Sequence, residues 1–156
     1  MAESKKLLII AHAPSENTQK MLEAVINGAS NHDVENVQVR SLTPLETQPD
    51  DINAASAIIL GTTENLGYMA GLMKDVFDRC YYPCLDKTEG LPFAFYVRAG
   101  HDGTGTQRAI ESITKGLRWR LVQDPLIFRG DFQAGFIDQC EELGLAMAAS
   151  LEAGII

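Results

Sequence analysis

Short apolar runs alternate along this 156-residue chain with longer segments of helical periodicity. The apolar run at 6–11 does not alternate with polar residues, which is typical of a strand buried on both faces of a sheet. The expected strands lie at 6–11, 36–42, 57–60, 92–97 and 121–128. The expected helices lie at 15–30, 69–81, 106–118 and 133–152, with one short helical turn at 50–54. Strict alternation predicts a parallel sheet covered by helices on both faces.

The strand patterns also predict the order of the sheet. The amphipathic strand at 36–42 is typical of an edge, and Pro125 places the last strand at the other edge. We therefore expect one α/β domain over residues 1–156, a three-layer, doubly wound fold with a five-stranded parallel sheet in the order 2-1-3-4-5. Ligands of such sheets bind beyond the carboxyl ends of the strands, near the reversal between the first and third strands. Three loops are expected there: 12–18, 62–68 and 98–106.

Composition excludes several classes of protein. A net charge of −8 weighs against binding to nucleic acid, which requires basic surface. No apolar stretch approaches the roughly 20 residues that span a bilayer, and no signal segment is evident, so we expect a cytoplasmic protein that does not enter membranes. Three cysteines, an odd number, argue against a disulfide framework. With three scattered histidines, no metal site is expected.

The junction between the first strand and the first helix favours an anion. Ser15, Asn17 and Thr18 begin the helix directly after the strand. The free N–H groups of a helix start, together with hydroxyl groups, suit a phosphate. Simple helix capping by Ser15 is the alternative, because serine is common at that position in any case.

Two segments resemble a known family. The run LLIIAHAPSENT at 7–18 resembles the phosphate loop T/S-x-T-G-N-T of flavodoxin-like proteins. The run GTTENLGYMAGLMKDVFDR at 61–79 is similar to a segment of the WrbA-like quinone reductases and NADPH-dependent FMN reductases, G-T/S-P-x-Y-x-G-x-M-x-x-x-M-K-x-F/L-x-D-R. The resemblance spans essentially the whole chain and implies a flavodoxin-like fold, FMN as the cofactor and a homodimer or tetramer.

The resemblance and the three loops together indicate the cofactor-binding residues. They are His12, Ser15, Glu16, Asn17, Thr18, Thr62, Thr63, Glu64, Asn65, Leu66, Gly100, His101 and Asp102. The first loop would hold the phosphate, and the other two would lie beside the flavin ring. The chain departs from the family at Pro14, which has no N–H, and at Glu16, whose carboxylate must turn to solvent if a phosphate binds.

The resemblance implies an FMN-dependent oxidoreductase. It would pass reducing equivalents from NAD(P)H through the flavin to a quinone-like or other small acceptor. No catalytic side chain is expected, because the cofactor carries the chemistry. Carboxylates beside the ring, such as Glu64 or Asp102, would disfavour an anionic reduced flavin. Two alternatives stay open: a flavodoxin-type electron carrier without its own turnover, and a flavin-free interaction protein, which Pro14 and Glu16 suggest.

Overall fold

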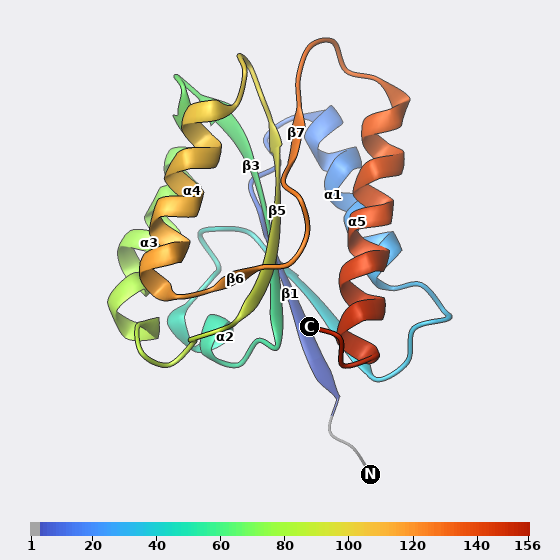
Figure 1. The fold of residues 1–156 in the computed structure, drawn as a ribbon. Helices are drawn as coiled ribbons and strands as arrows, with labels where there is room; N and C mark the ends of the chain where they lie inside the picture. The colour runs from blue at the N-terminus through green and yellow to red at the C-terminus, as the bar shows by residue number, and fades with distance from the viewer. Residues whose placement is uncertain (1–3) are drawn as a thin grey trace.

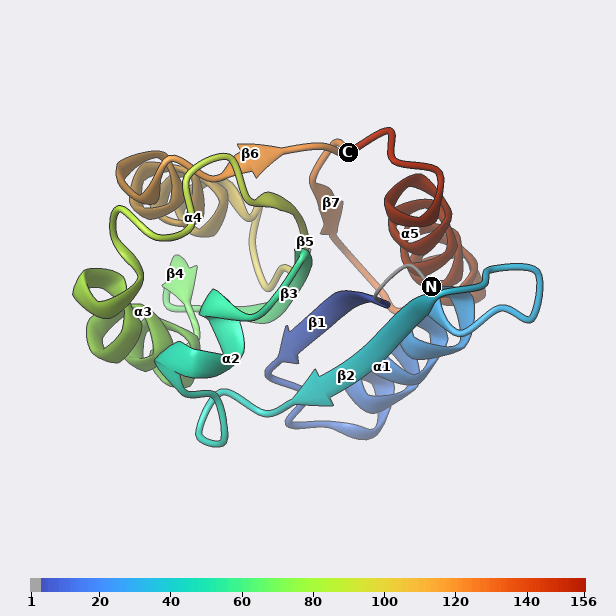
Figure 2. The same ribbon diagram turned by 90° about the horizontal axis from the view of Figure 1, so that it is seen from below.

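The computed structural model describes residues 4–156 as three layers, with a sheet between two layers of helices (Figure 1). The strands are β1 (Lys5–Ala11), β2 (Val37–Leu42), β3 (Ala57–Asn65), β4 (Tyr68–Met69), β5 (Pro92–Arg98), β6 (Arg120–Leu121) and β7 (Leu126–Phe128). The helices are α1 (Glu16–Ala29), α2 (Pro49–Asn53), α3 (Gly71–Cys84), α4 (Thr104–Leu117) and α5 (Ala134–Glu152). Viewed from below, α1 and α5 cover one face of the sheet, and α2, α3 and α4 cover the other (Figure 2).

The sheet order is β2-β1-β3-β5-β6, with β7 also pairing with β5. β4 returns antiparallel to β3, and every other pairing is parallel. Counted without β4, and with β6 and β7 taken as the two halves of the predicted last strand, this is the expected five-stranded 2-1-3-4-5 arrangement, so the predicted fold class is confirmed. The edge position of β2 is confirmed with it. The carboxyl ends of β1, β3 and β5 share one edge of the sheet, at the top of Figure 1.

The end of the third strand differs from the prediction. A strand ending at 60 and an open loop at 62–68 are wrong, because β3 continues to Asn65 and turns back into β4 as a hairpin. Pairing with β5 extends to Thr63, which lies opposite Arg98. Gly61 suggested that the strand ends there. However, β5 offers hydrogen-bond partners to the residues after Gly61. The second loop is therefore a hydrogen-bonded β-hairpin.

Two other boundaries differ. The predicted strand at 121–128 is divided by Pro125 into β6 and β7, because proline cannot donate to the ladder with β5. Pro83 lies inside the last turn of α3 rather than ending the helix before it. The turn nevertheless closes, since the Leu85 N–H donates to the Tyr81 carbonyl at 2.9 Å.

Two cores hold the layers together, one on each face of the sheet. Met73 and Phe77 of α3 are buried, as their helical spacing predicted. Met69 is buried beside them but lies in β4, because the predicted helix at 69–81 begins only at Gly71. On the other side α1 packs closely along α5. None of the helices in residues 4–156 is long and apolar enough to cross a membrane.

Candidate functional site

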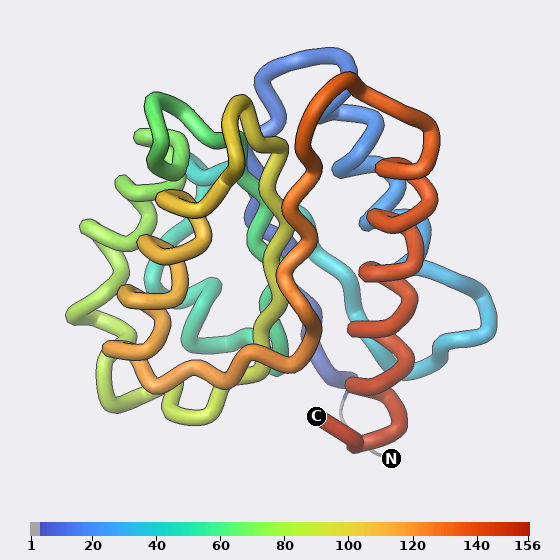
Figure 3. Tube along the Cα trace, turned by 45° about the horizontal axis from the view of Figure 1, so that its top comes forward, coloured from blue at the N-terminus to red at the C-terminus, as the bar shows by residue number. Residues whose placement is uncertain are grey.

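The three expected loops meet at the carboxyl edge of the sheet (Figure 3). Direct hydrogen bonds join them in sequence. The His12 N–H of the first loop donates to the Gly61 carbonyl at the start of the second, over 2.9 Å. The Glu64 side chain of the second loop accepts from the third. The predicted gathering of these loops at one edge is therefore confirmed.

Ser15 and Thr18 form a reciprocal cap at the start of α1. The Thr18 N–H donates to Ser15 Oγ over 3.2 Å, and the Ser15 N–H donates to Thr18 Oγ1 over 2.9 Å. The two hydroxyl groups also lie 2.8 Å apart. Thr18 is buried, and its hydroxyl takes part in the cap. The capping role predicted for Ser15 is confirmed.

The first turn of α1 still presents donors. The first intrahelical bond runs from the Gln19 N–H to the Ser15 carbonyl, so the N–H groups of Glu16 and Asn17 have no acceptor inside the helix. These groups and the positive end of the helix dipole suit an anion. The Glu16 carboxylate is exposed and lies 3.6 Å from Lys20 Nζ, one turn further along α1. It therefore faces solvent beside a cation, as phosphate binding requires.

The second loop is a two-residue hairpin connection with Leu66 and Gly67 at its tip. Both have positive φ, +52° and +77°, as a type I′ connection requires. Leu66 is fully exposed. Thr62 is buried instead, where its Oγ1 accepts from the Ala70 N–H over 3.1 Å and so holds the two arms together. Thr63 Oγ1 donates to Asn65 Oδ1 over 2.9 Å near the exposed end.

Glu64 connects the second loop to the third. Its Oε1 accepts from the His101 N–H over 2.6 Å, and its Oε2 accepts from the Gly103 N–H over 3.0 Å. Glu64 is only 8% exposed. Both carboxylate oxygens therefore bind backbone of this chain. Gly103 was missed by the sequence prediction, and its only signal was its place in a glycine-rich loop.

Asp102 also serves its own loop. Its carboxylate accepts from the Thr104 N–H over 3.0 Å, and this hydrogen bond lowers the pKa of Asp102. Its carbonyl accepts from Arg129 Nε over 2.6 Å. Arg129 is a second residue that the sequence prediction missed. Gly100, by contrast, has open space around it, with no atom closer than 3.8 Å to the place of a Cβ.

His12 is half-buried and lines a cavity of about 250 Å³ at the same edge. The cavity is lined by Ala11, His12, Ala13, Pro14, Thr43, Pro44, Leu45 and Leu72. Burial lowers the pKa of His12, which favours the neutral imidazole. The connection after β2 and the start of α3 were not expected here. They contribute the exposed side chains of Leu45 and Leu72, and no local sequence pattern indicated them.

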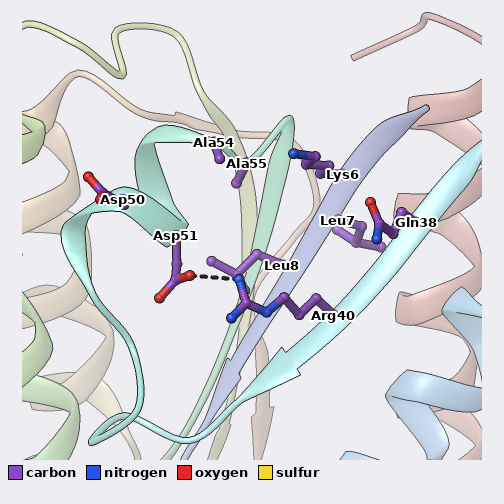
Figure 4. A pocket seen from close by; sticks show the side chains of 9 residues that line it. All are labelled: Lys6, Leu7, Leu8, Gln38, Arg40, Asp50, Asp51, Ala54 and Ala55. Carbon is purple, nitrogen blue, oxygen red and sulfur yellow. Dashed lines mark hydrogen bonds and ion pairs between the residues drawn. The ribbon is translucent and has the colours of Figure 1, made fainter. Parts of the chain in front are cut away.

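A second cavity, of about 300 Å³, lies away from these loops, between α2 and the first half of β1 and β2 (Figure 4). Arg40 Nη1 lies 2.6 Å from Asp51 Oδ1 across it. Opposite charges therefore already pair there. Within residues 4–156, no group of histidine, cysteine and acidic side chains could hold a metal ion.

Comparison with known proteins relates this geometry to a fold family. No protein-family profile matches the sequence. A flavodoxin of Aquifex aeolicus is 29% identical over 108 residues, which is 69% of this chain but only 57% of that flavodoxin. A flavodoxin from the domain Archaea superposes with a TM-score of 0.78 at 22% identity, over 94% of this chain and 98% of that one. The chain has the flavodoxin-like fold.

A further neighbour shares this flavodoxin-like fold. A WrbA-like flavodoxin of Agrobacterium tumefaciens superposes with a TM-score of 0.70 at 14% identity, over 97% of this chain and 99% of that one. The resemblance to flavodoxin-like proteins with WrbA-like relatives is thus confirmed for the fold. The cofactor and the site residues stay predictions.

Proposed function

We propose that this chain binds FMN at the carboxyl edge of its sheet and passes reducing equivalents from NAD(P)H to a quinone-like or other small acceptor. The observation that carries the proposal is the meeting of three loops at the edge of the sheet where α1 begins (Figure 3), together with the Glu16 and Asn17 N–H groups, which have no acceptor inside α1. The fold shared with flavodoxins and a WrbA-like protein supports it. The curated relative is itself named a flavodoxin.

The first loop would hold the phosphate. The backbone N–H groups of Glu16 and Asn17 would donate to it, and the Asn17 side chain is exposed beside them. Lys20 keeps the Glu16 carboxylate from facing the anion. With a chain charge of −8, these local donors must overcome long-range repulsion of the anion. We therefore expect FMN affinity to rise with salt at low ionic strength, because salt screens that repulsion.

The second and third loops would flank the flavin ring. When bound, flavin supplies hydride acceptance and electron release. Asn65 and Leu66 at the hairpin tip are exposed and available for contact, as are Gly100 and His101. The side chains of Thr62 and Glu64 would act by holding the loops, since their polar atoms already bind this chain's own backbone.

Titration with FMN and with riboflavin tests the binding site. Flavin fluorescence would be followed as protein is added. We expect FMN to bind at least about tenfold more tightly than riboflavin, because only FMN carries the anion that α1 would hold. Ser15→Ala should reduce this preference, since the loop that presents the N–H groups loses its cap. Equal affinity for the two ligands contradicts the phosphate site, and no binding of FMN favours a flavin-free interaction protein.

A turnover assay separates the enzyme from an electron carrier. The Aquifex match is the observation that favours a carrier. Steady consumption of NADH or NADPH by the FMN-loaded protein with a soluble quinone supports the reductase. Loaded protein that accepts electrons from a chemical reductant but does not turn over NADH or NADPH supports the carrier.

A further inference from the structure

We infer that Glu64 is a positioning residue that joins the second and third loops into one preformed wall of the proposed FMN site. The inference rests on the proposed function for the ligand but on the geometry alone for the coupling of the loops. One side chain in the hairpin accepts two backbone N–H groups, from His101 and Gly103, over 2.6 and 3.0 Å. These donors lie 37 and 39 residues further along the chain.

A buried carboxylate suits this role because both of its oxygens are acceptors. Gly103 has φ of +74°, which allows the third loop to turn and direct two N–H groups toward the same carboxyl group. Hydrogen bonds to a charged acceptor are about twice as strong as neutral ones. The Gly103 N–H group is buried with its residue, so it would be left without an acceptor if the carboxylate were removed.

A backbone contact beside Glu64 keeps the same loops in register. A Cβ on Gly105, in the first turn of α4, would lie 2.0 Å from the Gly67 carbonyl oxygen. The hairpin tip therefore rests directly on the start of α4. Two separate contacts therefore join the hairpin to the third loop and to the start of α4.

A preformed wall matters for affinity. Ligand binding that must first order two loops loses the free energy of ordering them. Glu64 would remove that cost without touching the ligand, because both of its carboxylate oxygens already accept from the third loop. This differs from the sequence expectation that Glu64 acts on the flavin through its charge.

Amide hydrogen exchange of the ligand-free protein tests the coupling directly. In Glu64→Gln the side chain keeps its shape but presents an NH₂ group to one of the two N–H donors. We expect exchange at His101 and Gly103 to become about tenfold faster or more, while buried Ile59 of β3 is unchanged. Glu23→Gln, an exposed change on α1 with the same loss of charge, serves as the control and should alter neither loop.

FMN titration of the same variants tests the positioning role. We expect Glu64→Gln to bind FMN about tenfold more weakly than the wild type and Glu23→Gln to bind it equally well. Should Glu64→Gln fail to fold, Glu64→Asp keeps the charge but is one methylene shorter, and it should also loosen the loops and weaken binding.

The possible failures are distinct. Unchanged exchange at His101 and Gly103 overturns the coupling. Faster exchange with unchanged FMN affinity overturns the positioning role. If the wild type does not bind FMN, the proposed function and the positioning role both fail, whereas the exchange data still decide whether Glu64 joins the loops.

Discussion

Gly28 of α1 and Gly144 of α5 each lie against the backbone of the other helix. A Cβ on Gly28 would be 1.9 Å from the Glu141 carbonyl oxygen, and one on Gly144 would be 2.0 Å from the Val25 carbonyl oxygen. The absence of two side chains thus sets how closely α1 approaches α5. That approach in turn orients the start of α1, where the phosphate is proposed to bind.

Gly144→Ala should destabilise the fold by about 3 kcal/mol, because the new methyl group meets rigid backbone and the two helices must separate. Urea unfolding followed by circular dichroism measures this. Gly135, near the start of α5, has nothing within 4 Å of a Cβ position. Gly135→Ala is therefore the matched control and should be neutral or stabilising by up to about 1 kcal/mol. Equal losses in the two variants would show that the helix contact is not the cause.

Leu66→Asn should stabilise the ligand-free protein by about 1 kcal/mol, since leucine is strained at positive φ and asparagine tolerates it. The same change should weaken FMN binding if Leu66 contacts the ring as proposed. Urea unfolding measures the change in the free energy of unfolding, and flavin titration measures the change in FMN affinity. Leu45→Asn removes another exposed leucine that lacks positive φ and should not stabilise. A loss of stability in Leu66→Asn contradicts the strain argument.

Thr106 Oγ1, in the first turn of α4, is buried and has no hydrogen-bond partner among the residues that the structure describes. Thr106→Val should therefore be neutral or stabilising by about 1 kcal/mol, because a buried hydroxyl without a partner is replaced by a methyl group of the same shape. Thr114, also buried on α4, donates to the Ile110 carbonyl over 2.8 Å. Thr114→Val should cost about 1 kcal/mol in thermal or urea unfolding. The prediction fails if the two variants lose stability equally.

Stability should fall above about pH 9. Burial raises the pKa of Cys84 to about 11 and that of Cys140 to about 12, from an ordinary value of 9.0. The folded state thus favours the neutral thiols, and the unfolded chain ionises first. Their contribution is fully present below pH 9 and is lost progressively as the pH rises toward 12. Unfolding free energies at pH 8, 9 and 10.5 measure the slope. The slope of the unfolding free energy against pH should be shallower in Cys140→Ala. An unchanged slope would contradict the role of this thiol in the pH dependence.

The parts of the fold that local pattern controls were predicted well. Ser15 lies three residues before Thr18, so the cap could be recognised from spacing, and both partners lie in one turn. The edge position of β2 followed from its half-exposed pattern. The end of β3 was missed, because pairing of Thr63 with Arg98 depends on a strand more than 30 residues away.

The sequence by itself determined the alternation of elements, the strand order and the three loops at one edge, because apolar periodicity and parallel crossovers leave few arrangements. Tertiary structure alone decided what the loop side chains do. Glu64 finds its partners at His101 and Gly103 only after two strands pair, so no local pattern could assign it to the protein's own backbone rather than to a ligand. Short-range preferences act within a few residues, whereas a buried carboxylate binds whichever donors the folded sheet brings near it.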